Sequence, residues 1–351
     1  MPDMRKSFLV LILLGLLAVT ACGAGVRAVP TLSHDFTTAT PDPGYPTAMP
    51  TFTPTPAALG SPENPVVFAF VDPAPSAEQQ AAFNDLASLL GGNLRMSVQS
   101  RFYNNYGDLE FALQQNQVHF AWLQPVQYLL ASQKGLATAL VVTNHLGVTG
   151  YGVQFLGHSD SKFTSYFNVG THSATADANV ALAQLSGLRA CLTKDNSLAG
   201  YWVPLGYLRK YNIPTLEPVQ TFSYSASIRA LYIKGICSFA ATYAISADPR
   251  TSSEVITDLP EAIEKLPILW LSPPVIPNLN LSFSPQVDLS LQSRVSDFLR
   301  EHARSDAGKS QISLALDYEV AALEPMPDAA YDPLRELLLA SGVRLADLLT
   351  D

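Results

Sequence analysis

Short apolar runs that alternate with helical patterns constrain the fold of this chain more than any other feature. VVFAFV (Val66–Val71) is continuously apolar, as expected of a strand buried on both faces. A helical pattern follows and is expected to end at Gly91-Gly92, after which LRMSVQ (Leu94–Gln99) alternates like a strand. A second helical pattern leads to VHFAWL (Val118–Leu123), a third expected strand. Such a β-α-β-α-β series favours a parallel sheet with helices on both faces.

The same pattern returns in the second half of the chain. LRACLT (Leu188–Thr193) and ICSFAA (Ile236–Ala241) are expected strands, and the segments DNSLAG and SIRALYIKG open helices between them. We therefore predict an α/β fold of two lobes, each a mainly parallel sheet flanked by helices, with a central cleft. Ligands of open α/β sheets bind beyond the carboxyl ends of the strands, so the ligand site is expected between the lobes.

The amino-terminal residues predict export from the cytoplasm. Arg5 and Lys6 precede an apolar run, Phe8–Val19, that is too short to span a membrane comfortably and has the length of a signal-peptide core. The run ends in VTAC, whose cysteine is Cys22. We predict a lipoprotein signal peptide over residues 1–21, lipidation of Cys22, and an extracytoplasmic protein anchored to the cell membrane. The alternative is an ordinary signal peptide cleaved nearby, with an incidental cysteine.

Composition limits which classes of function are possible for the residues after the signal peptide. Eight of the 26 prolines fall between residues 23 and 62, where large apolar residues are few, so we expect residues 22–62 to be a disordered tether. The formal net charge is −9, which provides no basic footprint for nucleic acid. The six histidines have no metal-ligand spacing, and no catalytic motif is present. We therefore predict no enzyme, catalytic residue, metal or cofactor.

Four segments, in this order, resemble one known family. They are YGDLEFALQQNQVHFAWLQP, ACLTKDNSLAGYWVPLGYLRKYNI, LWLSPPVIPN and EPMPDAAYDPLRELLLASGV. Together they resemble the phosphate, phosphite and phosphonate substrate-binding proteins of ABC transporters, which have the type-II periplasmic binding protein fold. The resemblance implies a solute-binding protein that partners an ABC permease, with lobe I over residues 63–152 and 276–351 and lobe II over 153–275. We expect a monomer. TSYFNVGTHSATADAN (Thr164–Asn179) has no counterpart and is expected to be a loop insertion.

The resemblance also implies which residues hold the ligand. The family binds a phosphorus oxyanion through a Ser-Thr-Ser loop, a histidine, an aspartate and a tyrosine. Ser197 matches the first serine, but Leu198 and Ala199 replace the other two hydroxyls. The tyrosine matches Tyr106, the histidine falls on Ser225 or on Tyr224, and the aspartate falls on Ser238. The pocket is thus expected to bind a small polar or anionic solute, with weak affinity for phosphate or a simple phosphonate. Asp72, Ser76, Gln124, Gly200 and Tyr201 complete the expected site.

Three alternatives remain open at this stage. The rings of Trp122, Tyr201 and Trp202 either stack on a larger ligand or belong to the cores of the lobes. Cys191 and Cys237 are expected to pair as a disulfide between neighbouring strands, or else are two buried thiols. The protein itself is expected to serve transport, and the alternative is a ligand-sensing or interaction module of a membrane sensor protein. In either case the amides of Ala199 and Gly200 are expected to face the ligand.

Overall fold

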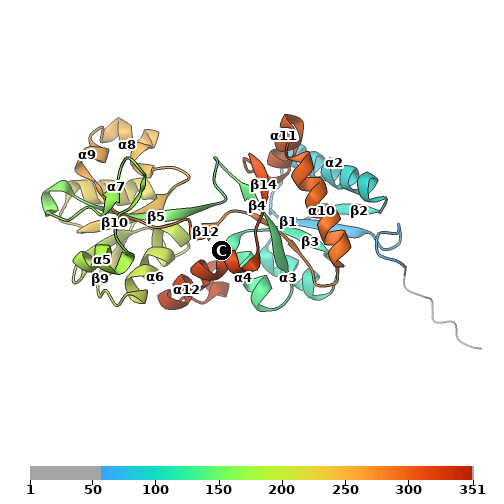
Figure 1. The fold of residues 1–351 in the computed structure, drawn as a ribbon, viewed down its shortest axis with the longest axis horizontal. Coiled ribbons are helices and arrows are strands. Elements are labelled where there is room, and N and C mark those ends of the chain that lie inside the picture. Colours follow the sequence, from blue (N-terminus) through green and yellow to red (C-terminus); the bar gives the residue numbers. More distant parts are fainter. Residues whose placement is uncertain (1–56, 350–351) are drawn as a thin grey trace, which may run out of the picture. The chain divides into compact units, whose positions relative to one another are not determined.

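The computed structural model describes residues 57–349. The expected signal peptide, the lipidated Cys22 and nearly all of the expected tether lie outside these residues and stay predictions. Within the described part, the chain forms two six-stranded sheets and one two-stranded ribbon (Figure 1). No helix of residues 57–349 is long and apolar enough to cross a membrane.

The first sheet is built from both ends of the described chain. Its strand order is β14-β4-β13-β3-β1-β2. The strands are β1 (Val66–Val71), β2 (Val98–Tyr103), β3 (Phe120–Leu123), β4 (Thr138–Asn144), β13 (Asn280–Phe283) and β14 (Ala322–Pro325).

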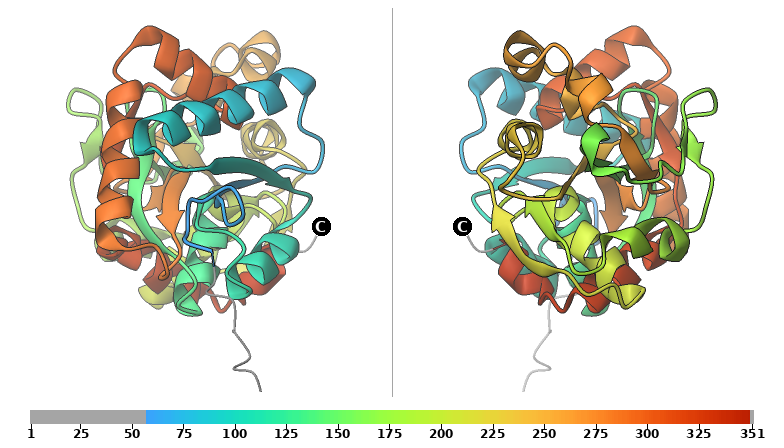
Figure 2. Two further views of the ribbon diagram at one scale, coloured as in Figure 1. Left: turned by 90° about the vertical axis from the view of Figure 1, so that its right-hand side faces the viewer. Right: turned by 90° about the vertical axis from the view of Figure 1, so that its left-hand side faces the viewer.

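Helices cover both faces of this sheet, as Figures 1 and 2 show. One face buries Phe68 of β1, whose ring lies 4.7 Å from that of Phe83. The helices on this face are α2 (Ala77–Leu94), α10 (Leu289–His302) and α11 (Asp306–Leu316). The other face buries Ala69 and Leu109, and its helices are α3 (Tyr106–Gln114) and α4 (Pro125–Gln133).

The second sheet has the strand order β11-β5-β10-β8-β9, with β12 paired to β5. Its strands are β5 (Gly150–Gly157), β8 (Arg189–Leu192), β9 (Leu216–Gln220), β10 (Phe239–Ala244), β11 (Ile268–Leu271) and β12 (Ile276–Pro277). One face is covered by α7 (Tyr224–Ile233), α8 (Ser253–Asp258) and α9 (Ala262–Lys265). The opposite face is covered by α5 (Ala178–Leu182) and α6 (Val203–Lys210).

Parallel pairing is confined to half of each sheet. β1 pairs in parallel with β2 and β3, and β8 pairs in parallel with β9 and β10, as the βαβ series predicts. The remaining pairs, β13 with β3 and β4, β14 with β4, and β5 with β10, β11 and β12, are antiparallel. The two-lobed α/β architecture is as expected, but antiparallel pairing is more extensive than a mainly parallel sheet implies. The reason is that the chain passes from one sheet to the other and back, and the returning strands run in the opposite direction.

Three expected elements have shifted boundaries. The strand expected over Leu94–Gln99 is β2, Val98–Tyr103, which begins four residues later because the preceding helix includes Leu94. The first helix does not stop at Gly91-Gly92 but continues to Leu94, and Arg95 ends it with a left-handed backbone. A Cβ on Gly91 would lie 2.9 Å from the Met96 carbonyl oxygen, so this glycine permits close packing rather than ending the helix. β10 covers Phe239–Ala244, three residues later than the expected strand.

The C-terminal helix α12 (Asp332–Ser341) connects by packing to the second sheet. It lies against α6, and the contact is close enough that a Cβ on Gly206 would meet the Leu337 carbonyl oxygen at 2.3 Å. One apolar cluster therefore runs from helices α3 and α4 through α12 to α5 and α6. The expected insertion forms a small hairpin of β6 (Phe167–Asn168) and β7 (Ser173–Ala174) that contacts β11.

Candidate functional site

The loop after β8 forms a capped turn that opens α6. Residues Leu198–Trp202 make a single π-helical turn directly before α6, and such turns are frequent at functional sites. Ser197 caps the turn, with its Oγ accepting from the Gly200 amide at 3.0 Å. The amide of Thr193 donates to the Gly200 carbonyl oxygen at 3.0 Å. A Cβ on Gly200 would lie 1.9 Å from the Thr193 Oγ1, so only glycine fits here.

The backbone donors of this turn differ from the expectation. The Gly200 amide does not face a ligand, because the Ser197 hydroxyl already accepts its hydrogen bond. Among the described residues, the amides of Leu198 and Ala199 have no hydrogen-bond acceptor. These two N–H groups lie at the start of a helix, where the backbone leaves its first donors unsatisfied. The donor expected at Ala199 stays available, and Leu198 adds a second.

One tyrosine contacts the capping serine, and a second tyrosine packs on the first. The hydroxyl of Tyr224, the first residue of α7, lies 2.9 Å from Ser197 Oγ. Its ring packs edge-on against Tyr243 of β10, with centroids 4.8 Å apart. Burial raises the pKa of Tyr224, although the hydrogen bond to Ser197 lowers it, and burial also raises the pKa of Tyr243. Both phenols therefore stay neutral at physiological pH and keep their donor protons.

Two further tyrosines were not predicted as site residues. Burial, together with the nearby phenols of Tyr224 and Tyr318, raises the pKa of Tyr151 on β5. Burial raises the pKa of Tyr318 to about 12, against a lowering hydrogen bond to Thr143, and its ring stacks on His145 at 4.4 Å. Tyr151 lies near the amino end of β5, and Tyr318 follows α11, so no single sequence motif unites them. Only the fold brings these rings together.

Leu198 lies in an apolar setting. It packs against a cluster formed by Tyr106, Val126 and Leu130, which leucines of the C-terminal turn Leu345–Leu349 also cover. Tyr106 is 7% exposed, and its hydroxyl has no hydrogen-bond partner among the described residues. Burial raises the pKa of Tyr106, so the phenol is neutral. Where a hydroxyl of the loop was expected to meet a ligand, a leucine side chain packs instead.

The first-lobe residues lie at the carboxyl ends of their strands. Asp72 follows β1, and its carboxylate accepts from the Ala74 amide at 2.9 Å and from Gln79 Nε2 at 3.0 Å. Ser76 caps α2, so its hydroxyl is occupied by the Gln79 amide. Gln124 follows β3, caps α4 and is exposed. Of these three, Gln124 has the side chain with the most freedom to reach a solute.

A sequence profile described as "ABC transporter, phosphonate, periplasmic substrate-binding protein" matches residues 68–331. The chain belongs to this family. The family consists of extracytoplasmic solute-binding proteins that bind small anionic ligands and work with ABC transporter permeases. Among curated proteins, none matches the chain in sequence.

Solved structures similar to this family member include XAC2383, which shares its fold, and PhnD1. XAC2383 from Xanthomonas citri bound to chloride ion has 15% identity and a TM-score of 0.53, and the match covers 80% of this chain and 98% of that chain. The same protein bound to ATP also has 15% identity and a TM-score of 0.53, covering 81% and 99%. PhnD1 from Prochlorococcus marinus, in complex with methylphosphonate, has 12% identity and a TM-score of 0.45, covering 78% and 96%. The fold is that of the type-II periplasmic binding proteins.

Two residues carried over from the family lie away from the loop of Ser197. Ser238 is at the amino end of β10, where its amide donates to the Arg189 carbonyl oxygen at 2.8 Å. Because β10 runs parallel to β8, this end is opposite to the one that leads into the loop. The structure therefore does not bring Ser238 to the loop of Ser197, and the position carried over for the aspartate is not part of this site. Ser225 turns toward α8, with its Oγ donating to Glu254 at 2.8 Å, so Tyr224 is the residue beside Ser197.

The tryptophans and cysteines have structural contacts. Trp122 is fully buried and lies in the core with Phe68, and its indole nitrogen has no partner among the described residues. Trp202 packs edge-on against Tyr201 and donates to the Asp195 carbonyl oxygen. The expected disulfide joins Cys191 of β8 to Cys237, with Cα atoms 5.5 Å apart. It links β8 to the segment that leads into the neighbouring strand β10.

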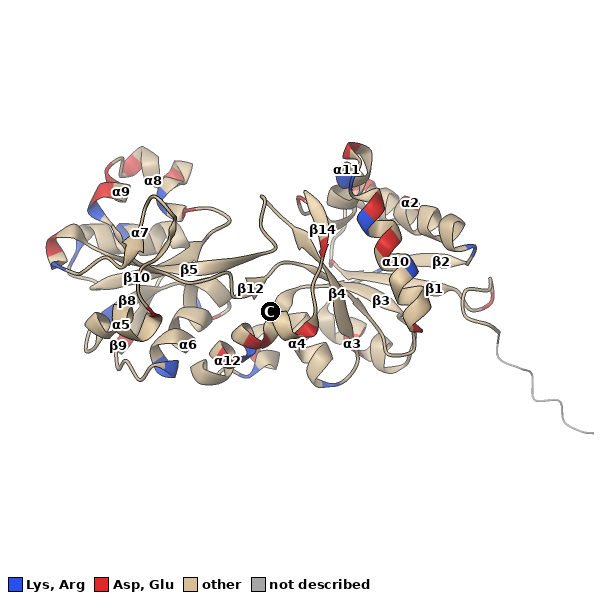
Figure 3. Cartoon of the chain, viewed as in Figure 1, with Lys and Arg blue, Asp and Glu red and all other residues tan. Residues whose placement is uncertain are grey.

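The distribution of charge and two cavities are the remaining features of residues 57–349. Lys and Arg are interspersed with Asp and Glu along helices such as α9, α10 and α12 (Figure 3). Residues 57–349 contain no group of three or more His, Cys, Asp and Glu that could hold a metal ion. A cavity of about 1100 Å³ lies between the insertion, α6 and α12, and another of about 750 Å³ lies between α4 and α12. Neither is lined by an expected ligand residue.

Proposed function

We propose that this family member is the lipid-anchored solute receptor of an ABC importer, with a ligand pocket altered from the phosphonate type. The family membership supplies the solute-binding role and the permease partner. The basic, apolar and VTAC segments that end at Cys22 support anchoring. Within residues 57–349 no structural feature favours the alternative of a sensing module.

The ligand site is proposed to lie between the two lobes, around the loop of Ser197. The supporting observation is that Leu198 and Ala199 stand where the family's loop carries hydroxyls, and that Leu198 packs on an apolar cluster. A hydrogen bond to a charged group contributes about 1.5–3 kcal/mol. Losing two such bonds weakens the binding of a phosphorus oxyanion by roughly 10²–10⁴.

The donors that remain suggest what the pocket binds. The free amides of Leu198 and Ala199, the neutral phenol of Tyr224 and the exposed amide of Gln124 are all uncharged. Uncharged donors hold a polar group without neutralising a full charge. We therefore propose a small solute with one polar or anionic group and a body large enough to contact the tyrosine rings.

Calorimetric titration of the ligand-free full-length protein tests the altered pocket. We expect weak binding of methylphosphonate and of inorganic phosphate. The double variant Leu198→Thr with Ala199→Ser should bind methylphosphonate more tightly than the unaltered protein, because it restores both hydroxyls. Leu216→Thr, at a half-exposed leucine on β9, is the matched control and should leave binding unchanged. Submicromolar binding of methylphosphonate by the unaltered protein would refute the altered-pocket proposal.

The anchor has a separate test. Cys22→Ala should release the protein from membranes or leave it unprocessed when expressed cells are fractionated. A processed Cys22→Ala protein that fractionates with membranes as before contradicts lipidation.

Mass spectrometry of the ligand released from natively purified protein then identifies the solute.

A further inference from the structure

The expected insertion builds one wall of the cavity that lies beside α6 and α12. The hairpin is fixed to the edge of the second sheet, with the Tyr166 amide donating to the Leu269 carbonyl oxygen at 2.8 Å. At its end, the indole nitrogen of Trp270 donates to the Ala176 carbonyl oxygen at 3.0 Å. Trp270 therefore both holds the hairpin segment in place and lines the cavity. The cavity has a volume of about 1100 Å³, slightly above the roughly 300–1,000 Å³ that is typical of small-molecule sites.

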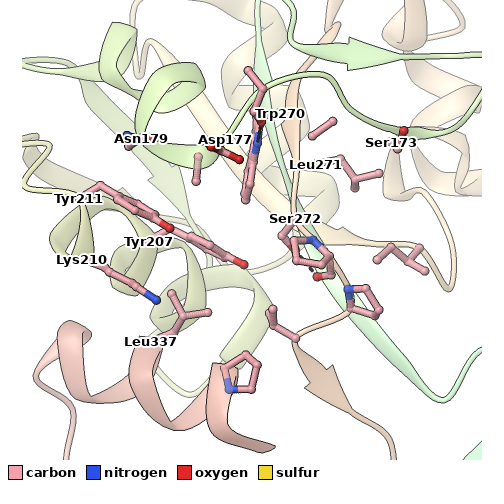
Figure 4. A pocket seen from close by; sticks show the side chains of 18 of the residues that line it. Ser173, Asp177, Asn179, Tyr207, Lys210, Tyr211, Trp270, Leu271, Ser272 and Leu337 are labelled. Carbon is pink, nitrogen blue, oxygen red and sulfur yellow. Dashed lines mark hydrogen bonds between the residues drawn. The ribbon is translucent and has the colours of Figure 1, made fainter. Parts of the chain in front are cut away.

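Aromatic side chains line the inner part of this cavity (Figure 4). The rings of Trp270 and Tyr207 pack edge-on with centroids 5.0 Å apart, and Tyr211 lies one turn along α6. Trp270 is 3% exposed and Tyr207 is 6% exposed, so their positions are set by packing rather than by solvent. Aromatic faces carry a negative potential that attracts cations and also accept apolar bodies.

The charges around the cavity are unbalanced. The lining contains three carboxylates, Asp177, Asp332 and Glu336, and one ammonium, Lys210, which gives a formal charge of −2. Glu336 lies 2.6 Å from Lys210, so that ammonium is already paired, and Asp332 lies 2.8 Å from Arg335. The carboxylate of Asp177 has no hydrogen bond or ion pair within residues 57–349. It is next in the chain to Ala176, whose carbonyl oxygen meets Trp270.

We propose that this cavity binds an organic cation, an ammonium group attached to an aromatic or apolar body. The Asp177 carboxylate pairs with the ammonium, and the body packs on the exposed ring of Tyr211, beside the buried rings of Trp270 and Tyr207. An anion is disfavoured because the one ammonium of the lining is held by Glu336. The site shares no residue with the pocket proposed around Ser197, so the two proposals stand or fall independently.

A charge-matched ligand series tests this site on the full-length protein. Phenethylammonium, phenethyl alcohol and phenylacetate have the same aromatic body and differ in charge, and calorimetry measures each affinity. We expect phenethylammonium to bind most tightly and phenylacetate to bind most weakly. Asp177→Asn should weaken phenethylammonium binding by about 2- to 5-fold, the effect of an exposed ion pair, and leave phenethyl alcohol unchanged, since only the charged interaction is lost.

The variant is expected to fold, because Asp177 is exposed and makes no side-chain cap bond to α5. Asparagine is as good a residue as aspartate at that cap position. Asp85→Asn, an equally exposed charge on α2, is the control and should not change the affinity. The proposal is overturned if phenethylammonium shows no saturable binding, if phenylacetate binds at least as tightly, or if Asp177→Asn behaves like the control.

Discussion

Gly200 is the residue on which the shape of the proposed ligand loop most depends, and Gly200→Ala is the sharpest test of that shape. The added Cβ would lie 1.9 Å from Thr193 Oγ1, 2.8 Å from Thr193 Cγ2 and 2.9 Å from Ser197 Oγ. All three distances are shorter than real contacts of a Cβ. Thr193 cannot easily move away, because it is buried and its amide is bonded to the Gly200 carbonyl oxygen at 3.0 Å.

The expected cost follows from two effects. Overpacking of a well-packed site costs about 1–3 kcal/mol. Displacing Ser197 Oγ from the Gly200 amide removes a helix cap, which costs about 1 kcal/mol. We therefore expect Gly200→Ala to lower the free energy of unfolding by roughly 2–4 kcal/mol. The better helix propensity of alanine offsets at most about 1 kcal/mol of this.

Urea unfolding of the purified protein measures the change. Gly92→Ala is the control, because an added Cβ there meets nothing within 4 Å on the exposed face of α2. It should raise stability by about 0.5–1 kcal/mol. Thr193→Ala removes two of the clashing atoms, so it should recover part of the loss when combined with Gly200→Ala, with a coupling of about 1–2 kcal/mol. Full stability of Gly200→Ala, or no coupling to Thr193, would refute the close approach.

Three further changes have expected outcomes. Replacing Cys191 and Cys237 by alanine should lower the free energy of unfolding by about 4 kcal/mol on the chain-entropy account, given a sequence separation of 46, as measured by denaturant unfolding. Burial would raise the pKa of Asp248, but hydrogen bonds and the ion pair from Arg250 outweigh it and hold that pKa below its ordinary value of about 3.9. The stabilisation that the Asp248 carboxylate contributes is therefore present above its ordinary pKa and is lost as the pH falls through the lowered pKa. Asp248→Asn should consequently be less stable than the unaltered protein at pH 7, and its stability should decline less steeply below about pH 4. Tyr224→Phe removes the hydrogen bond to the capping serine and should cost about 1 kcal/mol in the same assay; an unchanged stability would contradict that bond.

Local pattern was sufficient to predict the elements whose identity depends on their own residues. The apolar run Val66–Val71 is a strand with the expected bounds, because a continuous apolar segment of that length is stable only when both faces are buried. DNSLAG opens a helical turn as expected, and Ser197 caps that turn through a hydrogen bond between residues only three apart. The alternation of such elements was enough to predict the two-lobed α/β fold.

Tertiary structure decided the features that depend on contacts between distant segments. Whether Gly91 ends a helix or permits close packing depends on what lies beside it, and that neighbour is the chain around Met96. The place of Ser238 depends on the parallel pairing of β10 with β8, which puts the residue before β10 at the end of the sheet opposite the loop of Ser197. The tyrosines around Ser197 come from separate elements, and the cavity beside Trp270 is closed by the insertion and α12, which are far apart in sequence. Periodicity in the sequence indicates which face of a helix or strand is buried. Which segment of the chain buries that face is determined only when the sheets and helices pack.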